Sequence, residues 1–381
     1  MMREMDFIDE YYADKDLSLL KKLTLVIPTY NRNYYLSRCL WYHAHFPFGE
    51  IIVADSSPEE KKVVNRETVQ KTREGFGANI RYLEYEPETE KYGGDIYRKW
   101  GDAVQHVETE YSQIVTDKEF LIPDTACKCI YYLEISPDYM LVDGKHHSIE
   151  QSPDQKYMYT SLPTVTRNED DSWERFLKMT ENPGCTLLAL HRTQTMKQAY
   201  TSLVEHNVND IRFGEIYLEL QSIILGKAMT VNDTPLIYRD TITFEKEHGQ
   251  NKLKESSSFR YPQLWEYDKT ERDKYYASFK NGVVASLSKT TQVQQEQYLP
   301  LVDTVLQNYI SKRMGKAHPL RRFTVIKKLF YHLPKKIQRY ILRTIMGDAC
   351  GVSDFVPKDL HDTHDSNMII KIINDTTTQY K

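Results

Sequence analysis

The chain has 381 residues, of which 40% are hydrophobic and 27% are charged, and its formal net charge is −4. These proportions predict a globular protein with one large core and a smaller appendage, or with two domains. They exclude a strongly basic polyanion binder, and no stretch approaches the roughly 18 uncharged apolar residues of a membrane-spanning helix.

The N-terminal sequence and the cysteines favour a cytoplasmic protein. The first ten residues are acidic and lack the apolar core of a secretory signal. The cysteines are odd in number, and the spacing of Cys127 and Cys129 matches neither a zinc knuckle nor a thioredoxin-type motif. We therefore expect reduced thiols in the cytoplasm.

Residues 1–22 form a polar lead-in with one predicted short helix, and the first strand follows. Residues 23–28 are an apolar run typical of a strand buried on both faces, and Pro28 is expected to end it. In open α/β sheets, ligands bind beyond the carboxyl ends of strands, so Thr29–Arg32 is a candidate site. The alternative is an ordinary strand-to-helix turn.

Strands and helices then alternate, which predicts an α/β sheet. Asp55 closes the second strand. This carboxylate could accept a hydrogen bond from a base or ribose, or it could cap the turn through its own backbone. The predicted elements are helix 34–42, strand 50–55, helix 61–72, strand 80–85 and helix 97–107.

The next strand ends on two carboxylates, Asp117 and Glu119, with Lys118 between them. Carboxylates one residue apart at a strand end can share Mg²⁺ or Mn²⁺, which prefer oxygen ligands and often bind substrate phosphates as well. Such a metal would neutralise a departing diphosphate. The pattern therefore predicts a metal and nucleotide site.

The remaining elements are less regular. They are helix 125–136, strand 139–142, a polar excursion over 146–171, strand 184–190, helix 212–225, and a strand pair at 230–232 and 235–238. From about residue 245 the pattern predicts only helices, at 296–311 and 323–345. The predicted divisions are a lead-in at 1–22, a catalytic domain at 23–245 and a helical region at 246–381.

Three segments of the chain resemble the family 2-like glycosyltransferases of GT-A fold. They are 27–32 (Ile-Pro-Thr-Tyr-Asn-Arg), 53–57 (Val-Ala-Asp-Ser-Ser) and 116–119 (Thr-Asp-Lys-Glu), in the order and spacing of that family. The resemblance covers about residues 23–240. It implies a Rossmann-like, mixed but mostly parallel sheet flanked by helices.

The resemblance also assigns site residues. It places a divalent metal, Mn²⁺ or Mg²⁺, on Asp117 and Glu119. Glu119 departs from the usual second Asp, and Lys118 stands where the family often has a further acid. The implied nucleotide-binding residues are Pro28, Thr29, Tyr30, Arg32, Asp55 and Asp117.

The family has a catalytic base on a helix ahead of an L-x-x-x-G pattern. Glu215 precedes Leu218, Leu220 and Gly226 at a similar spacing, so the resemblance gives this role to Glu215, with Asp210 in reserve. The family's usual Glu-Asp pair is Gly214-Glu215 here, so the role rests on one carboxylate.

The implied activity is inverting, metal-dependent transfer of a sugar from a nucleotide-sugar donor. The acceptor would be a glycan or a lipid-linked molecule, in cell-surface polysaccharide or glycoconjugate synthesis. The alternative is a non-catalytic nucleotide- or sugar-binding module of the same fold. Sugar nucleotidyltransferases are disfavoured, because the Gly-rich loop with Arg and Lys that opens them is missing after Ile27.

Residues 312–343 are strongly basic and contain no Asp or Glu. Interleaved apolar residues make parts of the segment amphipathic, which predicts peripheral contact with the inner face of a membrane or packing on the catalytic domain. Nucleic acid is the least favoured partner and is not predicted. The basic residues are Lys312, Arg313, Lys316, Arg321, Arg322, Lys327, Lys328, Lys335, Lys336, Arg339 and Arg343.

Overall fold

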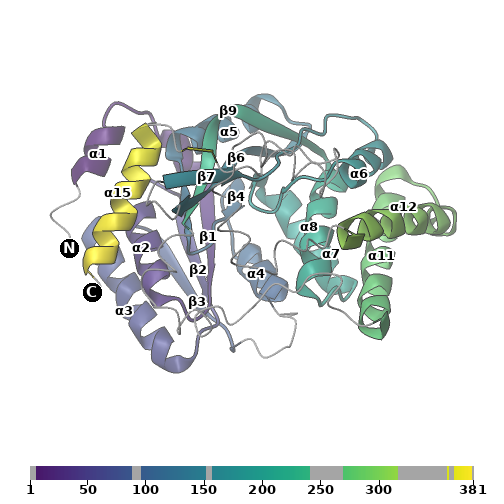
Figure 1. Ribbon diagram of the computed structural model, residues 1–381, viewed down its shortest axis with the longest axis horizontal. Helices are drawn as coiled ribbons and strands as arrows, with labels where there is room; N and C mark the ends of the chain where they lie inside the picture. Colours follow the sequence, from purple (N-terminus) through teal and green to yellow (C-terminus); the bar gives the residue numbers. More distant parts are fainter. Residues whose placement is uncertain are drawn as a thin grey trace.

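The computed structural model describes residues 6–87, 96–151, 157–240, 269–315, 358–359 and 364–379. Its centre is one mixed β-sheet with helices packed on its two faces (Figure 1). The predicted fold class, a mostly parallel α/β sheet flanked by helices, is confirmed. No helix of the described segments is long and apolar enough to cross a membrane.

The N-terminal half of the sheet is parallel, in the order β3-β2-β1-β4. Every residue of β1 and β2 is buried, as expected for strands covered on both faces. The chain runs outward from β1 to β3 and then returns to place β4 on the other side of β1, so the strand order reverses between β1 and β4. The elements are β1 (Leu23–Thr29), α2 (Asn33–His43), β2 (Glu50–Asp55), α3 (Glu59–Phe76), β3 (Ile80–Glu84), α4 (Ile96–Gln105) and β4 (Tyr111–Ile114).

The other half of the sheet is held mainly by antiparallel pairs. β8 joins the halves by pairing antiparallel with both β4 and β6, and β9 pairs antiparallel with β5 and parallel with β6. The strands are β5 (Glu119–Leu121), β6 (Tyr139–Gln151), β7 (Tyr157–Ser161), β8 (Leu190–Arg192), β9 (Lys227–Asp240) and β10 (Lys358–Asp359).

The helices that follow the sheet strands extend the same core. Buried side chains of α11, α12 and α15 belong to one hydrophobic cluster with those of β1 and β2. Tyr11 Oη donates to Asp365 Oδ1 at 2.6 Å and joins α1 to α15. The remaining helices are α1 (Asp6–Tyr12), the 3₁₀ helix η1 (Ser18–Lys22), α5 (Pro123–Ile135), α6 (Ser172–Glu181), α7 (Thr193–Glu205), α8 (Ile211–Leu225), α11 (Lys269–Thr291), α12 (Gln295–Gly315) and α15 (His364–Gln379).

Several predicted elements differ from the observed ones. The predicted strand at 184–190 is wrong, because most of this apolar run is buried without pairing and only Leu190 enters β8. The polar excursion at 146–171 is also wrong, since β6 and β7 occupy much of it. The strand pair at 230–238 is one strand, β9, and the C-terminal region contains β10 where only helices were predicted.

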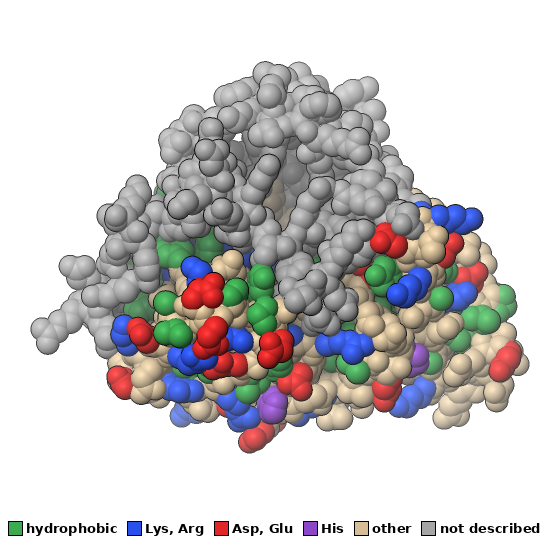
Figure 2. Space-filling model, turned by 90° about the horizontal axis from the view of Figure 1, so that it is seen from below, with side chains coloured by type: hydrophobic (Ala, Val, Ile, Leu, Met, Phe, Trp, Pro, Cys, Tyr) green, Lys and Arg blue, Asp and Glu red, His purple; other side chains and the backbone are tan. Residues whose placement is uncertain are grey.

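Two predictions about the C-terminal part lie outside the described residues. They are the helix at 323–345 and nearly all of the basic segment 312–343. The domain boundary at 245 stays a prediction, because residues 241–268 are also outside the described part. Figure 2 shows acidic and basic side chains interspersed over the described part of one face.

Candidate functional site

The carboxyl ends of β1 and β4 lie side by side where the strand order reverses. Ligands of open α/β sheets bind in the crevice outside such a topological switch point. Thr29 is the last residue of β1, Asp117 follows β4 by three residues, and Asp55 ends β2 opposite Thr29 in the register. We call Thr29, Asp55 and Asp117 the switch-point site.

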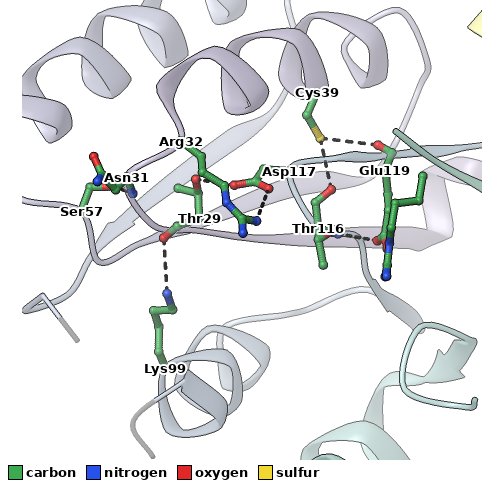
Figure 3. Close-up of polar contacts among 10 residues, drawn as sticks. Thr29, Asn31, Arg32, Cys39, Ser57, Lys99, Thr116, Asp117 and Glu119 are labelled. Atoms are coloured by element: carbon green, nitrogen blue, oxygen red, sulfur yellow. Dashed lines mark hydrogen bonds and ion pairs between the residues drawn. The ribbon is translucent and has the colours of Figure 1, made fainter. Parts of the chain in front are cut away.

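Asp117 is buried and contacts residues at the end of β1. Thr29 Oγ1 donates to Oδ2 at 2.8 Å, and Arg32 Nη1 donates to Oδ1 at 3.2 Å (Figure 3). The Arg32 side chain is 32% exposed, so it reaches from the buried carboxylate to solvent. The structure therefore brings the predicted loop and the predicted carboxylate together.

Asp55 is fully buried and accepts three hydrogen bonds. The Ser57 N–H donates to Oδ1 at 2.7 Å, while Asn65 Nδ2 and Tyr82 Oη each donate to Oδ2 at 2.6 Å. Burial, together with the bond to Asp55, raises the pKa of the Tyr82 hydroxyl well above its usual value. These contacts match the turn-capping alternative, and the nucleotide role of Asp55 stays a prediction.

The loop after β1 is tied to the loop after β2. Asn31 has a φ of 54°, a conformation that Asn tolerates, and its N–H donates to Ser57 Oγ at 2.8 Å. Lys99 of α4 donates to Ser56 Oγ at 2.6 Å and to the Thr29 carbonyl oxygen at 3.3 Å. Lys99 was not predicted, because a lysine inside a helix gives no local signal of a distant partner.

The other predicted nucleotide contacts lie in or beside β1. Pro28 is buried within the strand and faces Ala54 of β2 in the register, so it shapes the strand end. Tyr30 is half-buried immediately after the strand. Their contact with a nucleotide stays a prediction.

Glu119 is turned toward partners other than those of Asp117 (Figure 3). Arg239 of β9 donates from Nε to Glu119 Oε1 at 2.9 Å, and the Thr116 N–H donates to Oε2 at 2.7 Å. The Glu119 side chain is buried, and each of its two oxygens accepts one of these hydrogen bonds. The Arg239 partner was missed, since it comes from a strand 120 residues further along the chain.

Both carboxylates of the predicted metal site are paired with arginines. Mg²⁺ and Mn²⁺ prefer carboxylate oxygens as ligands, and such an oxygen can accept a hydrogen bond at the same time. Here Arg32 already pairs with one carboxylate and Arg239 with the other. Within the described segments, no cluster of three or more His, Cys, Asp or Glu side chains could hold a metal. Metal dependence stays a prediction from the resemblance.

Lys118 stands between the two carboxylates in the sequence, and its Nζ lies over an aromatic ring. Its Nζ is 4.4 Å from the ring centroid of Tyr35, within the range of a cation–π contact. Burial, followed by repulsion from Arg32, lowers the pKa of Lys118 to about 8. The Lys118 carbonyl oxygen accepts the Asp240 N–H at 2.9 Å, which fixes the turn against the end of β9.

A fully buried ion pair supports this turn. Arg38 of α2 contacts Asp240 Oδ2 at 2.8 Å, and its guanidinium carbon lies 5.1 Å from the ring centroid of Phe120. Removing one partner of a buried pair leaves an uncompensated charge, which is strongly destabilising. We therefore assign the pair to holding α2 against β9, a role that the sequence did not indicate.

The two predicted base candidates have different contacts at the start of α8. Asp210 is the buried N-cap, and its Oδ1 accepts the N–H groups of Arg212 at 2.9 Å and Phe213 at 2.8 Å. Glu215 lies about one turn further on, is 24% exposed and pairs with the Arg212 side chain. Asp210 is engaged in capping, while Glu215 is more exposed but paired with Arg212, and the role of either carboxylate as the base stays a prediction.

Gly214 packs against the ring of Tyr97 in α4. A Cβ at position 214 would lie 2.5 Å from Tyr97 Cδ2, which is shorter than real Cβ contacts. A side chain at this position would therefore clash with the Tyr97 ring as it stands. The same contact ties the first turn of α8 to α4, the helix that carries Lys99.

Comparisons with known proteins give similarity in structure only. No protein-family model and no curated protein sequence matches the chain. Its structure is similar to that of TarS from S. aureus, at 13% identity and a TM-score of 0.43 over 78% of this chain and 55% of that chain. It therefore spans about half the length of that protein.

Two structures of TarS residues 1–349 are similar to the same degree. The complex with UDP-GlcNAc gives 12% identity and a TM-score of 0.42, and the complex with UDP gives 13% and 0.43. Each match covers 77% of this chain and 90% of the other. Because these similarities are low, the candidate site rests on its own geometry.

Proposed function

We propose that this protein transfers a glycosyl group from a nucleotide-sugar donor to a hydroxyl group of an acceptor. The observation that carries the proposal lies at the switch-point site, where Thr29 and Arg32 both donate to Asp117 beyond the ends of β1 and β4. This is the place at which doubly wound sheets bind nucleotides. Nearby cationic side chains would stabilise the charge that develops on a departing diphosphate.

The proposed reaction is a single displacement with inversion. The acceptor oxygen forms a bond to the anomeric carbon of the donor, and the bond from that carbon to the diphosphate oxygen breaks. The electron pair of the broken bond leaves with the nucleoside diphosphate. Glu215 accepts the acceptor's hydroxyl proton, the role of a general base. A glycan or lipid-linked acceptor, in cell-surface polysaccharide or glycoconjugate synthesis, is part of this proposal through the sequence resemblance.

The test is donor turnover by the full-length chain. UDP-, GDP- and dTDP-sugars would be supplied with a panel of glycan and lipid-linked acceptors, and release of nucleoside diphosphate would be measured. A Glu215→Gln variant, matched in size, provides the background rate. We expect wild-type release to exceed that background with one donor class. Binding of a donor without release would identify the alternative, a non-catalytic binding module.

A further inference from the structure

We infer that Arg98 of α4 is a positioning residue that holds the start of α8 in place relative to the ends of β1 and β2. The inference rests on the proposed function, because the start of α8 carries Glu215, the proposed base. Arg98 acts through the segment that joins α7 to α8, residues 206–210, which we call the α8 leader.

The first turn of α4 is fixed to the strand ends of the switch-point site. Lys99 is buried, and its Nζ donates to Ser56 Oγ at 2.6 Å and to the Thr29 carbonyl oxygen at 3.3 Å. Thr29 is the last residue of β1, and Ser56 directly follows the last residue of β2. The residues of α4 beside Lys99 therefore have a set position relative to the proposed nucleotide site.

Arg98 binds two side chains of the α8 leader. Its Nη2 donates to Asn207 Oδ1 at 2.8 Å and to Asn209 Oδ1 at 2.6 Å, and its Nε donates to Asn209 Oδ1 at 3.0 Å. A guanidinium has only donors, so the amide oxygens of both asparagines face it. Asn209 Nδ2 also donates to Asn207 Oδ1 at 2.5 Å, and Asn207 has a φ of 54°, which Asn tolerates. The three side chains therefore form one hydrogen-bonded unit that fixes the bend of the leader.

The leader passes this position on to α8. Asn209 is followed directly by the N-cap Asp210, whose Oδ1 accepts two backbone N–H groups of the first turn. Tyr97, the neighbour of Arg98 in α4, packs against Gly214. Two consecutive residues of α4 therefore hold the start of α8, one by hydrogen bonds to the leader and one by packing. A displacement of about 1 Å at a catalytic group can lower the rate about 100-fold, so this hold matters for Glu215.

The contact lies where it can set the geometry of the leader without supporting the core. Asn207 is exposed, and Arg98 and Asn209 are half-buried. Substitutions away from the core usually change the free energy of unfolding little. Loss of the Arg98 side chain should therefore loosen the leader and leave the rest of the molecule folded.

The first experiment measures the leader directly and needs no substrate. Hydrogen–deuterium exchange would compare the full-length wild type with Arg98→Gln, and the backbone amides of Arg212 and Phe213, which bind the cap, are the reporters. We expect these amides to exchange about 10-fold faster in the variant, from the loss of a hydrogen bond to a charged group, while the midpoint of urea unfolding is unchanged. Gln105→Ala should exchange like the wild type, because Gln105 lies on the same helix but contacts Thr201 of α7.

Asn209→Ala removes the same contact from the other side and provides the test if Arg98→Gln does not fold. It should speed exchange of the same two amides, and the double variant Arg98→Gln/Asn209→Ala should exchange no faster than the faster single variant, because both changes break one contact. Exchange at the wild-type rate in both single variants would overturn the inference.

The second experiment tests whether the leader acts through Glu215. Release of nucleoside diphosphate would be measured with the donor that the wild type uses. We expect Arg98→Gln to lower kcat about 10-fold or more, while the KM of the donor stays within about twofold. In a Glu215→Gln background the same change should cause no further loss, because the group that Arg98 positions is already removed. Arg98→Lys, which keeps the charge and a donor, should recover part of kcat.

The outcomes distinguish this inference from the proposed function. A raised KM with unchanged kcat in Arg98→Gln would show that Arg98 contributes to donor binding, and would overturn the inference. An equal loss of kcat with and without Glu215 would also overturn it. If the wild type releases no diphosphate from any donor, the proposed function itself fails, while the exchange rates still decide whether Arg98 holds the leader.

Discussion

At the scale of single residues, two carboxylates at the start of α8, Asp210 and Glu215, differ in their contacts. Glu215→Gln keeps the size of the side chain and removes its ability to accept a proton. We expect nucleotide affinity to stay within about twofold and turnover to fall by ~10²–10⁴-fold, the usual contribution of a general base. Steady-state kinetics and calorimetry on the same preparation check both values. Turnover at the wild-type rate would transfer the role to another group.

Asp210→Ala should behave in the opposite way. The substitution removes the side chain that accepts two backbone N–H groups of α8, and loss of an N-cap costs about 0.5–2 kcal/mol. We expect a lower free energy of unfolding in urea and nearly unchanged turnover at a temperature where the variant is folded. Asp210→Asn, which retains a capping oxygen, is the matched control. A large loss of turnover in both variants would contradict the division of roles.

The sequence predicted which polar residues stand at strand ends, but not their partners. A carboxylate after an apolar run is a local pattern, so Asp55 and Asp117 could be found from it. The contact between Glu119 and Arg239 depends on the pairing of β5 with β9, two strands far apart in the chain. Local patterns carry no information about such pairings, so the metal prediction was made without that arginine.

At the scale of elements, the predictions succeeded where each strand is buried on both faces and is followed by a helix. β1, β2 and β3 fall within a residue or two of the predicted ranges. The failures lie in the second half of the sheet, where strands pair antiparallel and long polar segments are strands. The run at 184–190 is one example, because its apolar residues predict burial, and a buried segment need not pair with a strand.

The last described helix should contribute to stability as part of the main core. Ile369 of α15 is fully buried in the cluster that includes residues of β1. Ile369→Ala should lower the free energy of unfolding by about 2–5 kcal/mol, from lost burial and the cavity left behind. Asn367→Ala, at an exposed position of the same helix, should stay within about 0.5 kcal/mol. Equal urea midpoints for the two variants would contradict the packing.

The position of α15 decides how membrane contact through 312–343 is to be tested. Deleting the chain after residue 311 would also remove α15 and part of the core. We therefore predict that Lys335→Gln, Lys336→Gln and Arg339→Gln combined reduce binding to anionic vesicles at low salt, while unfolding in urea is unchanged. Each basic residue near such a surface contributes about 1 kcal/mol. Wild-type protein that does not sediment with the vesicles would rule out the contact.

At the scale of the whole molecule, two buried histidines set a limit on stability in acid. Burial lowers the pKa of His43 and of His191 from 6.5 to about 4. Below pH 6.5 the unfolded chain takes up these protons and the folded chain does not, so stability falls as the pH drops from 6.5 toward 4. Within that window, each histidine lowers the free energy of unfolding by about 1.4 kcal/mol for every pH unit of acidification.

Urea unfolding at pH 7.5, 6.5 and 5.5 measures this effect. We expect the midpoint to fall mainly between the two lower values. His43→Gln should be less stable at pH 7.5 but lose less on acidification, whereas His106→Gln, at a half-exposed position, should follow the wild type. A wild-type midpoint that is constant down to pH 5.5 would contradict the assignment of neutral histidines to the core.

The contact between Gly214 and Tyr97 has a consequence for how such a protein can change over generations. Because the ring fills the space that a side chain at 214 would need, position 214 cannot gain a side chain while the ring stays in place. An ancestor or descendant with an acidic residue at 214 requires a smaller residue at 97 first, or in the same step. The two positions are therefore expected to vary together among relatives of this chain. A glutamate at 214 opposite an aromatic residue at 97 is the combination that selection should remove.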